Sequence, residues 1–153
     1  MTGARYGRRW KRSGHGRADF MRYCTDSWFL IALFQKEAKA VSIVENAKNK
    51  KDWLVIPIAA FSETAKKLLQ IGAAKEDILE FLAIAESSER ASLSALTKDI
   101  AWEAANIAHR FGIPLLDSFV AATAKICNAD ALLSGDEHFQ PLKKAKYLSL
   151  VSW

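Results

Sequence analysis

The sequence predicts an α/β fold, an α/β/α sandwich with a mostly parallel central sheet of about five strands. Short apolar runs typical of buried strands alternate along the chain with longer segments of helical periodicity. This alternation is the pattern of parallel strands joined by helices that cover both faces of a sheet. With 153 residues, half of them apolar, the chain has enough material for one domain with a substantial core.

The amino-terminal segment differs in charge from the rest of the chain. Residues 1–20 contain six basic residues and one acid, whereas residues 21–153 carry sixteen basic and sixteen acidic side chains. The formal charge of +5 therefore belongs to the amino-terminal segment. We expect residues 1–20 to be a disordered basic extension and residues 21–153 to form a single domain.

Two roles fit the basic extension. It is either a solvated tail in front of an ordinary start at Met21 or an arm that contacts RNA phosphates, and runs of like charge favour the tail. The side chains that would contact RNA are Arg8, Arg9, Lys11 and Arg12.

The cysteines and the hydropathy pattern indicate the compartment. Cys24 and Cys127 lie in apolar runs that we expect to be buried, and they form no pairing or zinc-binding motif. No apolar run approaches the roughly 18 residues of a membrane span, and no signal-peptide pattern is present. We therefore expect a soluble protein of the reducing cytoplasm, without membrane contact.

The first predicted strand covers residues 21–25. Asp26 or Ser27 is the expected N-cap of the helix that follows, over residues 28–34, which is apolar on all sides and therefore buried. A second helix is predicted over residues 37–48, where alanine and valine recur at helical spacing.

The middle of the chain continues the alternation. Residues 53–58 form a buried strand, with Pro57 expected at its end or at a sheet edge because proline lacks a backbone donor. A helix over residues 59–71 ends at Gly72, and another helix covers residues 76–86.

Residues 90–96 alternate between apolar and polar side chains, which predicts a half-buried strand. Thr97 is the expected cap of a helix that reaches Phe111, where Gly112 ends it and Pro114 prevents its continuation.

The last part of the chain begins with a helix rich in small residues, predicted over residues 116–127. Strands follow over residues 131–134 and 147–151, and an acidic turn follows the first of these strands.

Four acids stand next to the predicted strand ends. Asp26 and Asp136 each follow a strand, Glu63 lies early in the helix after a strand, and Asp117 opens the helix that leads into residues 131–134. Ligands of open α/β sheets bind beyond the carboxyl ends of the strands, so we expect these carboxylates to face one crevice. Taken singly, each acid also fits a structural role as a helix cap, a turn residue or a solvated charge.

Four carboxylates in one crevice repel each other, and we expect no cation of these motifs to offset them. Hard oxygen ligands of this kind suit one or two Mg²⁺ or Mn²⁺ ions. A pair of such ions can activate water and stabilise a leaving oxygen at a phosphodiester. Ser27 and Ser134 either orient the carboxylates or cap helix and turn ends, and the sequence leaves both roles open.

The chain resembles the PIN-domain nucleases from Met21 to about Val151. Four motifs match in order: TDSWFLIALF at 25–34, IPIAAFSETAKKL at 56–68, LLDSFVAATA at 115–124 and LLSGDEHF at 132–139. The last two motifs carry most of the resemblance. The departures are Val120 where the family has isoleucine, Ser134 where it has threonine, and the basic extension.

The resemblance implies an endoribonuclease that depends on Mg²⁺ or Mn²⁺ and binds the metal through Asp26, Glu63, Asp117 and Asp136. Small members with this layout are most similar to the VapC-type toxins of toxin–antitoxin modules. Those toxins usually form homodimers and are held inactive by an antitoxin peptide, so RNA, a second copy and an antitoxin are the expected partners.

Other functions fit parts of the same pattern. A nuclease of RNA processing remains open. A non-catalytic RNA-binding or scaffolding module would lack acids, and here all four are present. A phosphotransferase of the haloacid-dehalogenase type would need a second aspartate where this chain has Trp28. His138 follows two acids, and we expect it at a surface helix start rather than on a metal or a phosphate.

Overall fold

A computed structural model describes residues 20–152 of the chain. The RNA contacts considered for Arg8, Arg9, Lys11 and Arg12 lie outside these residues. The described part contains a five-stranded sheet in the order β3-β2-β1-β4-β5, and all four pairs of neighbouring strands are parallel. The strands are β1 (Arg22–Thr25), β2 (Trp53–Pro57), β3 (Ala91–Ser94), β4 (Ala131–Leu133) and β5 (Leu150–Val151).

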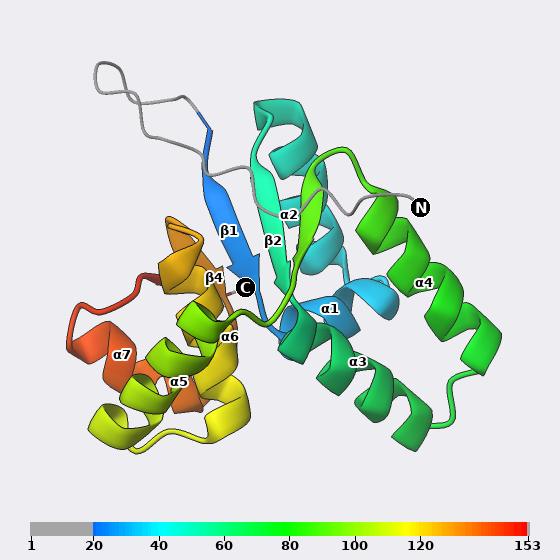
Figure 1. The fold of residues 1–153 in the computed structure, drawn as a ribbon. Coiled ribbons are helices and arrows are strands. Elements are labelled where there is room, and N and C mark those ends of the chain that lie inside the picture. Colours follow the sequence, from blue (N-terminus) through cyan, green and yellow to red (C-terminus); the bar gives the residue numbers. More distant parts are fainter. Residues whose placement is uncertain (1–19, 153) are drawn as a thin grey trace, which may run out of the picture.

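Helices cover both faces of this sheet. They are α1 (Ser27–Phe34), α2 (Ala38–Lys50), α3 (Ile58–Gln70), α4 (Lys75–Ser87), α5 (Lys98–Phe111), α6 (Leu115–Ile126), α7 (Gln140–Lys144) and the 3₁₀ helix η1 (Glu137–Phe139). Figure 1 shows α1 to α4 on one side of the sheet and α5 to α7 on the other. The predicted α/β/α sandwich is therefore confirmed.

The strand order reverses at β1, which lies between β2 and β4. The register places Thr25 opposite Leu133, and the backbone N–H of Asp26 donates to the carbonyl of Leu133 at 3.3 Å. Asp26 and Ser134, the next residue on each side, therefore emerge together at the carboxyl edge of the sheet. A reversal of strand order at this edge is where open α/β sheets form their ligand sites.

Helix α6 forms the centre of one layer, where it packs along α5 and against β1, β2 and β4. Its residues Ala121, Ala122 and Ala124 are fully buried. Small side chains on this face let the helix approach the sheet closely, and larger groups such as Phe29 and Leu132 fill the remaining core.

The helix boundaries follow the predicted capping residues. The hydroxyl of Thr97 accepts a hydrogen bond from the N–H of Ile100 at 3.2 Å and begins α5. Gly112 ends that helix with φ of 67°, a left-handed conformation that costs glycine little. Pro57 lies at the end of β2, as its missing donor predicts.

Two predictions about the second half of the chain are wrong in detail, and two short helices have no counterpart among the predicted elements. The last strand is only Leu150–Val151, because the N–H of Tyr147 donates to the carbonyl of Leu142 and caps α7 instead of entering the sheet. Helices η1 and α7 are too short to give a periodic signal, so the sequence indicates only a helix start at His138 in this region. Cys127 is only partly buried, because it caps the end of α6, whereas Cys24 is fully buried.

Within the described part of the chain, none of the helices combines the length and apolar character that a membrane span requires.

Candidate active site

The structure places the four predicted acids around the carboxyl edge of the sheet. Asp26 directly follows β1 and caps α1, and Glu63 lies in the second turn of α3. Asp117 is the third residue of α6, and Asp136 follows β4 and caps η1. Segments that are distant in the sequence thus contribute one carboxylate each to the same edge.

Asp26 is the most deeply buried of these acids, with 3% of its surface exposed. Its Oδ1 accepts a hydrogen bond from the N–H of Phe29 at 2.9 Å, and its Oδ2 accepts one from the hydroxyl of Ser134. Burial disfavours the charged form and raises the pKa of Asp26 to about 6, although the two hydrogen bonds act in the opposite direction. The negative charges of Asp136 and Glu63 raise this pKa further.

A second part of the site is formed by Asp117, Asp136 and His138. Nδ1 of His138 lies 2.8 Å from Oδ2 of Asp117 and 3.4 Å from Oδ1 of Asp136. One potential ligand atom from each of the three residues lies within 4.8 Å of the others. Burial raises the pKa of Asp117, the hydrogen bond with His138 lowers it, and the charges of Asp136 and Glu63 raise it.

The two parts belong to one electrostatic group. The charges of Glu63 and Asp136 act on the pKa of Asp26, and the same two charges act on the pKa of Asp117. Such effects require short separations, because charge interactions fall with distance and are screened by solvent. The structure therefore brings all four predicted acids together at one place.

The prediction that no cation offsets these acids is wrong. Nζ of Lys67 lies 2.9 Å from Oε1 of Glu63, one helical turn earlier on α3. The same ammonium donates a hydrogen bond to the hydroxyl of Ser27 at 3.3 Å. The signal was present in the sequence, because residues four apart on a helix are neighbours.

Ser27 and Ser134 make different contacts. The hydroxyl of Ser134 donates to Asp26 and accepts from the backbone N–H of Asp136 at 3.0 Å, so it links two of the acids. The hydroxyl of Ser27 contacts Lys67 rather than an acid. Ser134 thus orients a carboxylate directly, whereas Ser27 acts on the acids through the lysine.

The structure shows which of the acids also cap a helix. Asp26 is the N-cap of α1, and the side chain of Asp136 caps η1 by accepting from the N–H of His138 at 2.9 Å. A cap role for Asp117 is contradicted, because Pro114 is the N-cap of α6 and no side chain caps that helix. Asp117 therefore has no capping function that would account for its half-buried position.

The sequence favours His138 at a surface helix start over a contact with a metal or a phosphate. His138 does lie in η1 and its side chain is exposed, but its ring also binds Asp117. Its position two residues after Asp136 was the available signal. The contact with Asp117 depends on the tertiary packing of η1 against α6 and is not encoded by local spacing.

The donor set fits a divalent metal ion. Carboxylate oxygens are the ligands that Mg²⁺ and Mn²⁺ prefer. Asp117 and Asp136 each offer one such oxygen within 4.8 Å of the other, and the charges of Asp136 and Glu63 act on Asp26 beside them. The ionised form of Asp26 is disfavoured by burial and by its acidic neighbours, and a bound cation would relieve both effects. Asp26, Glu63, Asp117 and Asp136 are the residues suited to hold such an ion.

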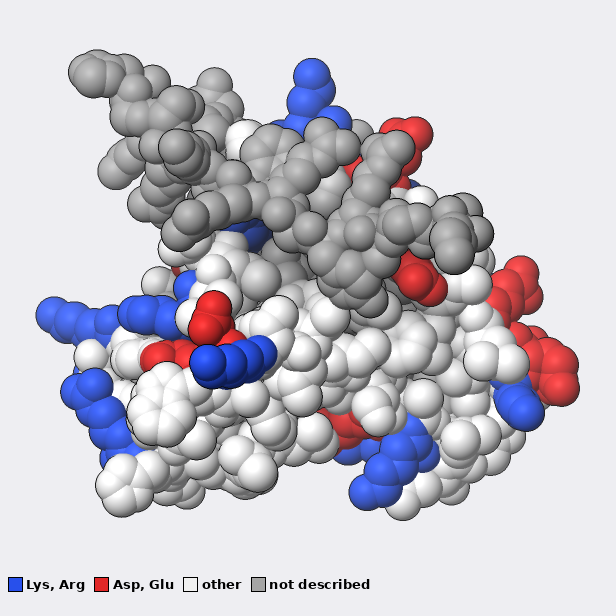
Figure 2. Space-filling model, in the orientation of Figure 1, with Lys and Arg blue, Asp and Glu red and all other residues white. Residues whose placement is uncertain are grey.

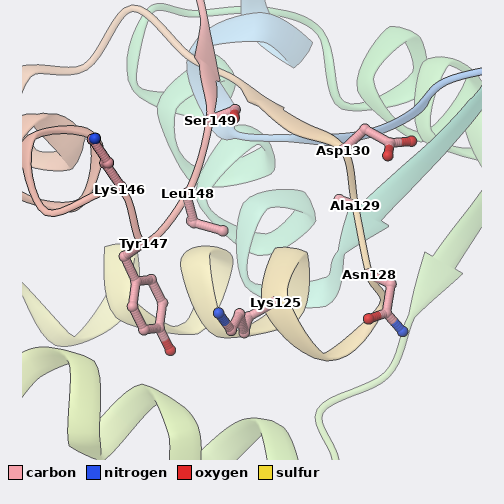
Figure 3. Close-up of a pocket in the computed structure, with 8 residues that line it drawn as sticks. All are labelled: Lys125, Asn128, Ala129, Asp130, Lys146, Tyr147, Leu148 and Ser149. Carbon is pink, nitrogen blue, oxygen red and sulfur yellow. The ribbon is translucent and has the colours of Figure 1, made fainter.

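A separate cavity of about 540 Å³ lies at the opposite, amino-terminal edge of the sheet. Its lining residues are Lys125, Asn128, Ala129, Asp130, Lys146, Tyr147, Leu148 and Ser149. Figure 3 shows Lys146 and Asp130 at opposite sides of it, each pointing away from Tyr147. Its polar groups do not converge on one point, and it contains none of the four acids.

Comparison with known proteins agrees with this architecture. The sequence of residues 23–145 matches the family described as PIN domain. No curated protein matches the chain in sequence.

Solved toxin–antitoxin structures share the fold. VapBC2 from Rickettsia felis, solved with a DNA fragment from its promoter, superposes with a TM-score of 0.70 at 17% identity, over 87% of this chain and 99% of that one. VapBC-1 from nontypeable Haemophilus influenzae gives a TM-score of 0.62 at 21% identity, over 87% and 98%. VapC20 from Mycobacterium tuberculosis, a toxin that cleaves the sarcin-ricin loop, gives 0.62 at 16% identity, over 77% and 92%.

The family match covers most of the chain and includes all four acids, and the fold of the described residues agrees with it. The chain belongs to the PIN-domain family.

Proposed function

We propose that the protein is an endoribonuclease that depends on Mg²⁺ or Mn²⁺. The observation that carries this proposal is the meeting of four carboxylates at one sheet edge, with Asp26 buried among them. A buried carboxylate beside other carboxylates is destabilising unless a cation compensates its charge. Membership in the PIN-domain family and the fold shared with VapC20 support RNA as the substrate.

In this proposal Asp26, Glu63, Asp117 and Asp136 hold one or two metal ions. When bound, such ions supply an activated water and stabilise the leaving oxygen of the phosphodiester. The chain contributes orientation: Ser134 fixes Oδ2 of Asp26, and His138 fixes Oδ2 of Asp117. Because these side chains are already held, little reorganisation is needed when substrate binds.

Cleavage of a circular single-stranded RNA tests the activity, because only an endonuclease can open a circle. We expect the purified protein to linearise the circle with Mg²⁺ or Mn²⁺ and to leave it intact in EDTA. Undiminished cleavage in EDTA would contradict the metal site, and a circle that stays intact with either metal would contradict the nuclease.

We further propose that the nuclease is the toxin of a VapBC-type module, with a homodimeric state and an antitoxin partner. The shared fold of VapBC2 and VapBC-1 supports this assignment. Large apolar side chains are exposed on both helical layers, with Trp102 and Leu115 on one and Trp28 and Ile84 on the other. Apolar groups exposed in this way suit surfaces that partners cover.

Induced expression in a bacterial host tests the toxin assignment. We expect wild-type protein to arrest growth and the Asp26→Ala variant to leave growth unaffected. A short upstream reading frame with a DNA-binding fold would agree with an antitoxin. Normal growth with an active nuclease would instead favour a role in RNA processing.

A further inference from the structure

Lys67 stands out among the basic residues because its ammonium lies within the acidic site. It is 2.9 Å from Oε1 of Glu63 and 3.3 Å from the hydroxyl of Ser27, which itself follows Asp26. Within residues 20–152, no other lysine or arginine forms an ion pair with any of the four acids. Among the described residues, Lys67 of α3 is therefore the one lysine or arginine whose charge is paired with these acids.

The hydrogen bonds of Lys67 leave part of its donor capacity unused. An ammonium group has three N–H donors, and Glu63 and Ser27 accept two of them. The side chain of Lys67 is 38% exposed, whereas that of Glu63 is 18% exposed, so the lysine forms the solvent side of the pair. A third donor is thus available to a group that approaches from solvent.

RNA that enters this site meets unfavourable charge. Its phosphates are negative, and so are the four carboxylates that surround the proposed reaction centre. Figure 2 shows lysine and arginine side chains in separate groups, mostly around the margin of the face drawn, with uncharged surface between them. A cation fixed inside the acidic site is therefore well placed to attract a phosphate to it.

We propose that Lys67 is a substrate-positioning residue whose ammonium, held by Glu63 and Ser27, binds a backbone phosphate of the RNA at the acidic site. The inference rests on the proposed nuclease function and names the group that receives the substrate. Glu63 and Ser27 limit the rotamers of the lysine, so less conformational entropy is lost when the phosphate binds.

Steady-state cleavage of a short single-stranded oligoribonucleotide of mixed sequence, at saturating Mn²⁺, tests this role. The variants are Lys67→Gln and Lys67→Met, which remove the charge, and Lys67→Arg, which keeps it. Lys66→Gln is the matched control, because Lys66 is the adjacent, exposed lysine on the same helix. Thermal unfolding of each variant establishes that it is folded.

We expect Lys67→Gln and Lys67→Met to raise KM about tenfold, the effect of losing one hydrogen bond to a charged group. Turnover at saturating RNA should change far less, because a contact made equally before and during the reaction affects KM rather than kcat. The slope of log kcat/KM against log salt should become shallower by about 0.7, the contribution of one phosphate contact on a single strand. Lys67→Arg should restore the salt slope, and Lys66→Gln should behave as wild type.

Two results would overturn the inference in different ways. If wild type and Lys66→Gln cleave RNA and the charge-removing variants keep the wild-type KM and salt slope, Lys67 only balances the charge of Glu63, and the proposed nuclease stands. If wild type does not cleave RNA with either metal, the proposed function fails and the role of Lys67 fails with it.

Discussion

The hydroxyl of Ser134 donates a hydrogen bond to Oδ2 of Asp26 across the junction between β1 and β4. The N–H of Phe29 holds the other oxygen of the same carboxylate. Two strands and the start of α1 therefore fix the orientation of one buried acid. Despite these bonds, burial keeps the pKa of Asp26 raised, to about 6.

This shift predicts how stability depends on pH without metal. An unfolded aspartate titrates near pH 4, so between pH 4 and 6 the folded protein binds more protons than the unfolded chain. The free energy of unfolding in EDTA should therefore fall as pH rises through this window. The contribution of Asp26 is on the order of 3 kcal/mol, and it is lost above pH 6. The raised pKa of Asp117 acts in the same direction.

Urea denaturation in EDTA at pH 5 and pH 7 measures this dependence. Asp26→Asn removes the titrating group but keeps an oxygen acceptor, so its stability should differ less between the two pH values than that of wild type. An equal pH dependence in both proteins would mean that Asp26 does not titrate as the structure indicates.

Asp117→Asn should abolish Mn²⁺-stimulated RNA cleavage while leaving the fold intact. The amide keeps the size of the carboxylate and can still accept from His138, but it removes the negative charge that a metal requires. Because Asp117 caps no helix, the variant should melt in EDTA no lower than wild type. A melting temperature lowered by the equivalent of about 1 kcal/mol would assign Asp117 a structural role instead.

Thr25→Val should stabilise the protein. The hydroxyl of Thr25 is fully buried and has no hydrogen-bond partner among the described residues. Valine has the same shape and no polar atom, so unfolding should require about 1 kcal/mol more free energy. Thr64→Val is the control, because the buried hydroxyl of Thr64 donates to the carbonyl of Ala60 at 2.7 Å. A higher free energy of unfolding in Thr64→Val but not in Thr25→Val would contradict the argument.

Local chemistry determined which parts of the fold the sequence could predict. Thr97 and Gly112 act on their own backbone neighbours, so the ends of α5 were readable from the sequence. The sandwich could be predicted from the alternation of strands and helices along the chain, because parallel strands joined by helices form a sheet covered on both faces. Over residues 137–144 the sequence indicates only a helix start at His138, because two short helices carry no periodic pattern.

In the candidate site, too, some features could be predicted from the sequence and others could not. The four acids could be predicted because each lies next to a strand end, and parallel strands bring their carboxyl ends to one edge. The contact of His138 with Asp117 depends on how η1 packs against α6, which spacing alone does not reveal. Lys67 was detectable, since it lies four residues after Glu63, but its bond to Ser27 requires the packing of α1 against α3.

Binding of Mn²⁺ to the purified protein, followed by the electron paramagnetic resonance of the free ion, tests the central claim most directly. We predict that wild-type protein binds Mn²⁺ and that Asp26→Asn and Asp117→Asn, which alter the two parts of the site, each bind it markedly more weakly. Wild-type affinity in both variants would contradict the claim that these carboxylates form one metal site.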